Sequence, residues 1–177
     1  MAVSLYTATI PAYLQTLPAM AGLIDKAEAH CREHGLAPSA LIEAQLAPDM
    51  WNFGTQIGVV RAHSAGALEG ARAGLFSPSF APPPADFAGL RAIIADAIAR
   101  VKAVTPDEIN ALEGRDAVFR FGERQMDFTA EDFLLSFSLP NFYFHASAAY
   151  AILRSKGLAV GKRDFLGTPR LKAPAAA

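Results

Sequence analysis

Two pairs of neutral polar residues are the side chains best placed for chemistry, and each pair lies in a largely apolar stretch. Asn141 and His145 are spaced i, i+4, so they share one face of a helix. His145 is the only acidic or basic side chain in residues 133–153. Gln56 and His63 share a face of an earlier predicted helix. Such amide and imidazole groups could bind a ligand, hold a metal ion or satisfy one another in a buried hydrogen-bond network.

Other catalytic patterns are weak. Serines lie near histidines in the sequence, but no acidic residue completes a catalytic triad. Cys31 falls on the apolar stripe of a helix, where a small buried hydrophobe is favoured over a nucleophile. The sequence therefore assigns no catalytic residue and leaves open whether the protein is an enzyme.

Four long helices must position these groups. Apolar residues recurring every three or four positions and capping residues predict helices over residues 9–34, 50–73, 86–104 and 129–156. Short connecting helices are predicted over residues 38–46 and 106–112. Residues 117–121 and 124–128 flank Gly122-Glu123, a pair that suits a hairpin turn.

Several residues indicate local departures from regular helices. Pro140 cannot donate a backbone hydrogen bond, so we expect a kink in the last long helix. Glycines recur along the second helix at Gly54, Gly58, Gly66 and Gly70, a spacing that permits close approach of another helix. We expect Trp51 to be a core or helix-entry anchor.

Composition limits the functional classes. The chain has 177 residues, a formal charge of −1 and 19% charged residues. Basic residues are scattered, which argues against nucleic acid as a partner. A single cysteine suits the reducing cytoplasm. Polar residues within 133–153 argue against a membrane span, and no basic residue precedes Lys26 as a secretory signal requires.

Long apolar stripes that cannot be buried alone predict an all-α four-helix bundle with short connecting helices. One small β-hairpin should precede the last long helix, and parallel strands would contradict this fold. We expect one domain over residues 1–167 and a flexible C-terminal tail over residues 168–177.

With these predicted elements, the chain resembles the DinB-like (YfiT-like) four-helix-bundle superfamily. Within that superfamily it resembles a bacterial branch known as a domain of unknown function. The resemblance covers about residues 4–167. It is carried by the stretches LAPDMWNFGTQI, LPNFYFHASAAYAILR and GKRDFLG. It implies a four-helix bundle of DinB-like type.

Metal-binding members of the superfamily use three histidines, one from the second helix and an i, i+4 pair from the fourth. By this resemblance His145 matches the second of the pair and Asn141 occupies the place of the first. The position expected in the second helix falls near Val59, and His63 lies one turn further along. Because an asparagine amide is a poor substitute for imidazole, the metal site is degenerate and we expect no metal and no cofactor.

The resemblance makes the second and fourth helices neighbours, which would bring Gln56, His63, Asn141 and His145 together. We expect these four residues to bind a small molecule in a polar pocket. A buried network that fixes helix register remains open, as does a metal-dependent thiol S-transferase-like enzyme. A further alternative is a non-catalytic structural or interaction bundle acting as a homodimer, because 52% of the residues are hydrophobic.

Overall fold

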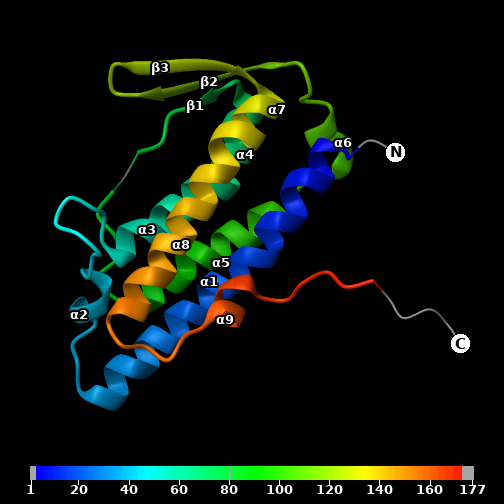
Figure 1. Ribbon diagram of the computed structural model, residues 1–177. Coiled ribbons are helices and arrows are strands. Elements are labelled where there is room, and N and C mark those ends of the chain that lie inside the picture. The colour runs from blue at the N-terminus through cyan, green and yellow to red at the C-terminus, as the bar shows by residue number, and fades with distance from the viewer. Residues whose placement is uncertain (1–2, 80, 173–177) are drawn as a thin grey trace, which may run out of the picture.

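Helices make up most of the protein in the computed structural model, which describes residues 3–79 and 81–172 (Figure 1). The mostly helical fold class predicted from the sequence is confirmed. Four helical segments are long, and two of them contain π-helical turns, labelled η. They are α1, Leu5–His34; α3, Phe53–Arg61, continued by η1, Ala62–Gly66, and α4, Ala67–Ala73; α5, Phe87–Lys102; and α7, Ala130–Asp132, continued by η2, Phe133–Ser138, and α8, Leu139–Ser155. The short helices are α2, Ser39–Ile42; α6, Pro106–Asn110; and α9, Lys162–Leu166.

The helix starts follow the capping residues, although two starts differ from prediction. α1 begins at Leu5 because the Ser4 hydroxyl accepts the Thr7 N–H, so the start predicted at Thr9 was wrong. α3 begins after Asn52, whose side chain accepts the Thr55 N–H, later than the sequence predicted. α5, α6 and the last long segment begin at the expected caps, Asp86, Thr105 and Thr129.

The long segments run side by side and pack pairwise (Figure 1). α1 contacts α5, α5 contacts α3, α3 contacts α8, and α8 contacts α1. Their inward faces form one apolar core that includes the fully buried side chains of Leu17, Phe53, Leu90 and Phe142. Because α3 and α8 are neighbours, side chains from the second and last long segments can meet in the interior.

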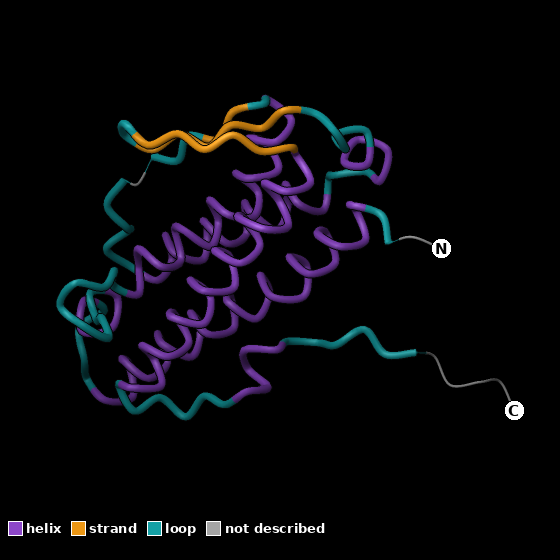
Figure 2. The backbone as a smooth tube through the Cα atoms, turned by 45° about the horizontal axis from the view of Figure 1, so that its top comes forward, coloured by secondary structure: helices purple, strands orange, loops and turns teal. Residues whose placement is uncertain are grey.

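A small sheet crosses one end of the helical part (Figure 2). β2, Asp116–Phe121, and β3, Arg124–Thr129, form the predicted hairpin about Gly122, which has a φ of 57°. β1, Leu75–Phe76, pairs parallel to β2 and makes the sheet three-stranded. The expectation of no parallel strand was therefore wrong. Gly74, at a φ of 72°, ends α4 and turns the chain so that its carbonyl accepts the Val118 N–H. The sequence did not predict β1 because two residues are too few to show the alternating pattern of a strand.

Phenylalanine rings attach the sheet to the last long segment. Phe119 of β2 lies 4.7 Å from Phe137 of η2, measured between ring centroids, and Phe128 of β3 lies 5.5 Å from the same ring. Phe76 of β1 lies 5.4 Å from Phe133. The sheet is thus held over η2 by aromatic packing.

The glycine stripe of the second segment permits close approaches of strand β1, of a proline-rich loop and, at Gly54, of Ile42 in the short helix α2. A Cβ added at Gly70 would lie 2.7 Å from Phe76 Cβ, and one added at Gly54 would lie 2.8 Å from Pro83 Cβ. The loop after β1 crosses this helix face. The expectation of helix–helix contact therefore holds only at Gly54, and the contact at Gly70 is with a strand.

The stretch GKRDFLG binds the C-terminal segment to α1. Asp164 accepts the Gly161 N–H at 2.7 Å and the Lys26 ammonium at 2.6 Å. Gln15 Nε2 donates to the Leu166 carbonyl at 3.0 Å. Gly167 passes so close to α1 that a Cβ there would lie 2.7 Å from the Gln15 carbonyl oxygen. Of the predicted flexible tail, residues 173–177 lie outside the described residues, and its flexibility stays a prediction.

Within the described ranges, none of the helices combines the length and the apolar character needed to cross a membrane.

Candidate functional site

A pocket of about 140 Å³ lies where α3, η1 and α8 meet β2. Three of the polar residues singled out from the sequence reach it, namely His63, Asn141 and His145. The rest of its wall is apolar and largely aromatic, formed by Trp51, Val59, Pro78, Phe119, Phe121 and Phe137. The structure therefore brings the predicted polar residues of the second and last long segments to one cavity.

Gln56 holds His145 from behind the pocket. His145 Nδ1 lies 2.6 Å from Gln56 Oε1, and both side chains are buried. Gln56 Nε2 in turn donates to the backbone carbonyl of Trp51 at 3.0 Å. The amide group is thus used at both ends, and Gln56 does not line the cavity itself. Its role is to orient the imidazole of His145.

His145 is held in its neutral form. Burial lowers its pKa from 6.5 to about 4, because removing the imidazole from water disfavours the charged ring. The indole of Trp51 stacks on the imidazole with ring centroids 5.4 Å apart and planes inclined by 24°. At neutral pH the pocket therefore presents an uncharged imidazole beside an aromatic face.

His63 is placed by two facing π-helical turns. Its Nδ1 lies 3.3 Å from Ser138 Oγ, and that hydroxyl donates to the carbonyl of His63 at 3.0 Å. His63 belongs to η1 and Ser138 to η2. Burial and, to a smaller extent, the neighbouring His145 together lower the pKa of His63 from 6.5 to about 4. The two imidazoles are nearly parallel, with centroids 6.2 Å apart and planes inclined by 11°.

A π-helical turn precedes Pro140, and the kink predicted at that residue stays a prediction. The N–H of Leu139 bonds to the carbonyl of Leu134, five residues back. In η1, Ser64 compensates the altered register by donating its hydroxyl proton to the Val60 carbonyl at 2.7 Å. Single π-helical turns inside α-helices are frequent at functional sites. Here they place His63 and Ser138 opposite each other.

Asn141 lines the pocket, but its amide bonds to its own helix. Asn141 Nδ2 donates to the Phe137 carbonyl at 2.7 Å. Among the hydrogen bonds of the described residues, His145 pairs with Gln56 rather than with Asn141. Asn141 and His145 both line the pocket, as their i, i+4 spacing predicted. The hydrogen-bond partner of His145 is Gln56 on α3, one of the four residues expected to meet.

The aromatic wall of the pocket was not predicted from the sequence. Trp51 is 43% exposed and stacks on His145, so its interpretation as a core residue was wrong; it does stand at the entry to α3. Phe119 and Phe121 alternate along β2 and therefore face the same side of the sheet. Phe137 lies one turn before Asn141, in the register 137, 141, 145. That register and that alternation were the signals available in the sequence.

A transition metal does not fit these residues. Val59, at the position expected for the histidine of the second helix, contributes only hydrocarbon, and Asn141 offers an amide oxygen where the pattern has an imidazole nitrogen. Over residues 3–79 and 81–172 there is no group of three or more His, Cys, Asp or Glu side chains that could hold a metal ion. The donors present fall short of the three or four ligands that zinc sites use.

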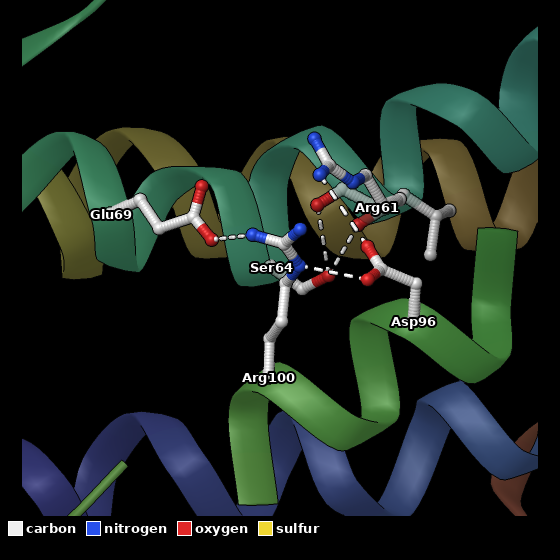
Figure 3. A network of polar contacts seen from close by, with 6 residues as sticks. Arg61, Ser64, Glu69, Asp96 and Arg100 are labelled. Atoms are coloured by element: carbon white, nitrogen blue, oxygen red, sulfur yellow. Dashed lines mark hydrogen bonds and ion pairs between the residues drawn. The ribbon is translucent and has the colours of Figure 1, made fainter. Parts of the chain in front are cut away.

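On another face of the α3–η1–α4 segment, charged side chains form ion pairs with α5. Figure 3 shows Arg61 and Arg100 sharing Asp96, at 3.5 Å and 2.8 Å, while Arg100 also reaches Glu69 at 2.6 Å. A larger hollow of about 380 Å³ lies nearby, lined by Arg61, Glu69 and Phe76. Its charged side chains are already paired, Arg61 with Asp96 and Glu69 with Arg100. We therefore place the candidate site at the smaller pocket, where the neutral imidazoles lie.

The packed helices, the capping sheet and the pocket of neutral polar groups define a helical protein of DinB-like fold. The chain belongs to the family described as Domain of unknown function (DUF1993), whose model matches residues 5–166. The family resemblance inferred from the sequence is thereby confirmed.

A solved structure supports the same fold. The chain is similar to the crystal structure of a DinB family member protein from Shewanella denitrificans at 1.83 Å resolution. The two chains share 25% sequence identity with a TM-score of 0.79, and the match covers 96% of each. Among curated proteins no match was found.

Proposed function

We propose that the chain forms a DinB-like four-helix bundle, one domain over residues 1–167, that binds a small molecule in the pocket between α3–η1 and α8. The observation that carries this proposal is the position of the cavity. It is lined by Val59, Asn141 and His145, which by the resemblance lie at or near the metal-ligand positions of the superfamily. Here they surround about 140 Å³ of space with side chains that suit a ligand better than a metal.

The pocket and the buried network are parts of one arrangement. Gln56 satisfies His145 from inside the core, and Ser138 satisfies His63. Each imidazole thereby keeps a fixed orientation while the ring also contributes to the pocket wall. Fixed polar groups in an apolar cavity are typical of small-molecule sites.

Filling the cavity tests this function. A panel of small neutral aromatic fragments is screened by protein-observed NMR against the wild type and Val59→Phe. We expect fragments to shift the signals of Trp51, Phe119 and His145 in the wild type and to bind at least tenfold more weakly to Val59→Phe. Val118→Phe is the matched control, because Val118 is half-buried on the neighbouring β2 and does not line the pocket. Equal binding to wild type and Val59→Phe would reject this pocket.

Self-association as a cytoplasmic homodimer is the second candidate, and it rests on the outward face of the last long segment. Leu135, Tyr143 and Phe144 are 40%, 38% and 59% exposed there. Large exposed apolar side chains can contribute to interaction surfaces. Light scattering should give a dimer mass for the wild type at micromolar concentration and a monomer mass for Phe144→Ser; a wild-type monomer would count against it.

A further inference from the structure

The orientation of the Gln56 amide is fixed by its two partners. The carbonyl of Trp51 can only accept a hydrogen bond, so the group 3.0 Å from it must be the amide nitrogen of Gln56. The amide oxygen then faces His145 at 2.6 Å. This assignment follows from donor and acceptor chemistry alone.

The amide oxygen in turn fixes the tautomer of His145. A carbonyl oxygen can only accept, so the proton of the neutral imidazole must reside on Nδ1. The other ring nitrogen, Nε2, then carries an unshared electron pair. Gln56 therefore leaves His145 with an acceptor and no donor for any molecule in the pocket that it lines.

Ser138 fixes the tautomer of His63 by the same reasoning. The Ser138 hydroxyl has one proton, and it donates that proton to the His63 carbonyl at 3.0 Å. Ser138 Oγ must then accept from His63 Nδ1, which lies 3.3 Å away. His63 Nε2 is consequently a second acceptor. Two neutral imidazoles that line one pocket both offer electron pairs.

The remaining wall selects for size, shape and charge. None of the described residues lining the cavity is Asp, Glu, Lys or Arg, so a charged ligand would lose hydration there without gaining a counter-ion. Trp51, Phe119, Phe121 and Phe137 offer flat ring surfaces. The volume of about 140 Å³ approaches that of a cavity of roughly 150 Å³ that accepts benzene. A single small ring fits this space.

We propose that the pocket binds a small, uncharged, planar molecule that donates an N–H or O–H hydrogen bond to Nε2 of His145, an inference that rests on the proposed function. His63 supplies a second acceptor to ligands with two donors. The low pKa of His145 makes its ring a weak base, which suits binding better than proton abstraction. The site therefore recognises donor groups on neutral rings, whether heterocyclic N–H or phenolic O–H.

Four small probes test this inference. Phenol has a neutral ring and a donor, and anisole has the same ring with the donor methylated. Benzoate carries a negative charge, and tetramethylammonium tests whether the aromatic wall instead recognises a cation. Affinities for the full chain at pH 7.5 are measured by NMR titration. We expect phenol to bind roughly 3- to 10-fold more tightly than anisole, the effect of one net hydrogen bond.

The outcomes separate the two proposals. If phenol and anisole bind equally at the pocket, the hydrogen-bond inference fails while the ligand pocket stands. Tighter binding of benzoate or tetramethylammonium also overturns the inference. If no probe shifts pocket signals, the proposed function itself fails.

A variant checks the role of Gln56. Gln56→Met removes the acceptor that fixes the tautomer, so both neutral forms of His145 become populated. The preference for phenol over anisole should fall in this variant. A folded Gln56→Met protein that keeps the full preference would overturn the inference, and if the variant does not fold, the wild-type series alone decides it.

Discussion

Acidification should destabilise the protein in a pH range set by its two buried histidines. The pKa values of His63 and His145 fall from 6.5 to about 4 on folding. Between these limits the unfolded chain binds more protons than the folded one, so the free energy of unfolding decreases as the pH falls. The decrease begins near pH 6.5 and is complete below about pH 4.

The magnitude follows from the same values. At pH 5 each histidine is mostly protonated in the unfolded chain and mostly neutral in the fold, a difference of roughly 2 kcal/mol per group. Replacing His145 with glutamine removes one of the two titrating groups and keeps an amide that can donate to Gln56. The loss of unfolding free energy between pH 7 and pH 5 should therefore be roughly 2 kcal/mol smaller in His145→Gln than in the wild type.

Urea unfolding at pH 7, 6 and 5 measures this difference. Carboxylates also contribute in acid: the Gly114 N–H lowers the pKa of Glu131, and the Lys26 ammonium lowers that of Asp164. Both groups are present in both proteins, so they cancel in the comparison. Equal losses in wild type and His145→Gln would refute the reasoning, because they would mean that His145 is protonated in the fold without cost.

Two further predictions use pairs of glycines that differ in their surroundings. Gly167→Ala places a Cβ 2.7 Å from the Gln15 carbonyl oxygen at a φ of 62°, so it should release α9 from α1 and destabilise the protein by roughly 1–3 kcal/mol. Gly161→Ala, which meets nothing within 4 Å, is the control, and equal melting temperatures for the two variants would contradict the account. Gly70→Ala should destabilise because its Cβ would lie 2.7 Å from Phe76 Cβ, whereas Gly58→Ala should stabilise α3 by up to about 1 kcal/mol because no atom lies within 4 Å. Thermal unfolding measures both changes, and a shift of the same sign in the two variants would show that the contact with β1 is unimportant.

Much of the fold follows from local sequence signals. Asp86, Thr105 and Thr129 act as caps where their side chains indicate, and Gly122 turns the hairpin. β1 was missed because two residues carry no periodicity and its pairing with β2 depends on contacts distant in sequence. The π-helical turns were missed because they depend on how two helices pack, which no local rule describes.

In the candidate site, too, local features were predicted from the sequence and long-range contacts were not. The i, i+4 spacing of Asn141 and His145 predicted their shared face, and the resemblance to DinB-like proteins predicted that Gln56 would lie across from them. Which amide reaches His145 depends on the packing of α3 against α8, over 89 residues of sequence separation. The aromatic wall was missed because Phe119 and Phe121 reach the pocket only through the placement of the sheet.

The central claim is that burial keeps His145 neutral and that Gln56 holds its proton on Nδ1, which leaves Nε2 available to a ligand. Long-range proton–nitrogen NMR of protein labelled with ¹⁵N in histidine reports the state of each ring nitrogen directly. At pH 7 the account predicts a protonated Nδ1 and an unprotonated Nε2 for His145, with Nδ1 becoming mixed in Gln56→Met. A protonated Nε2, or two protonated nitrogens in the wild type, would contradict it.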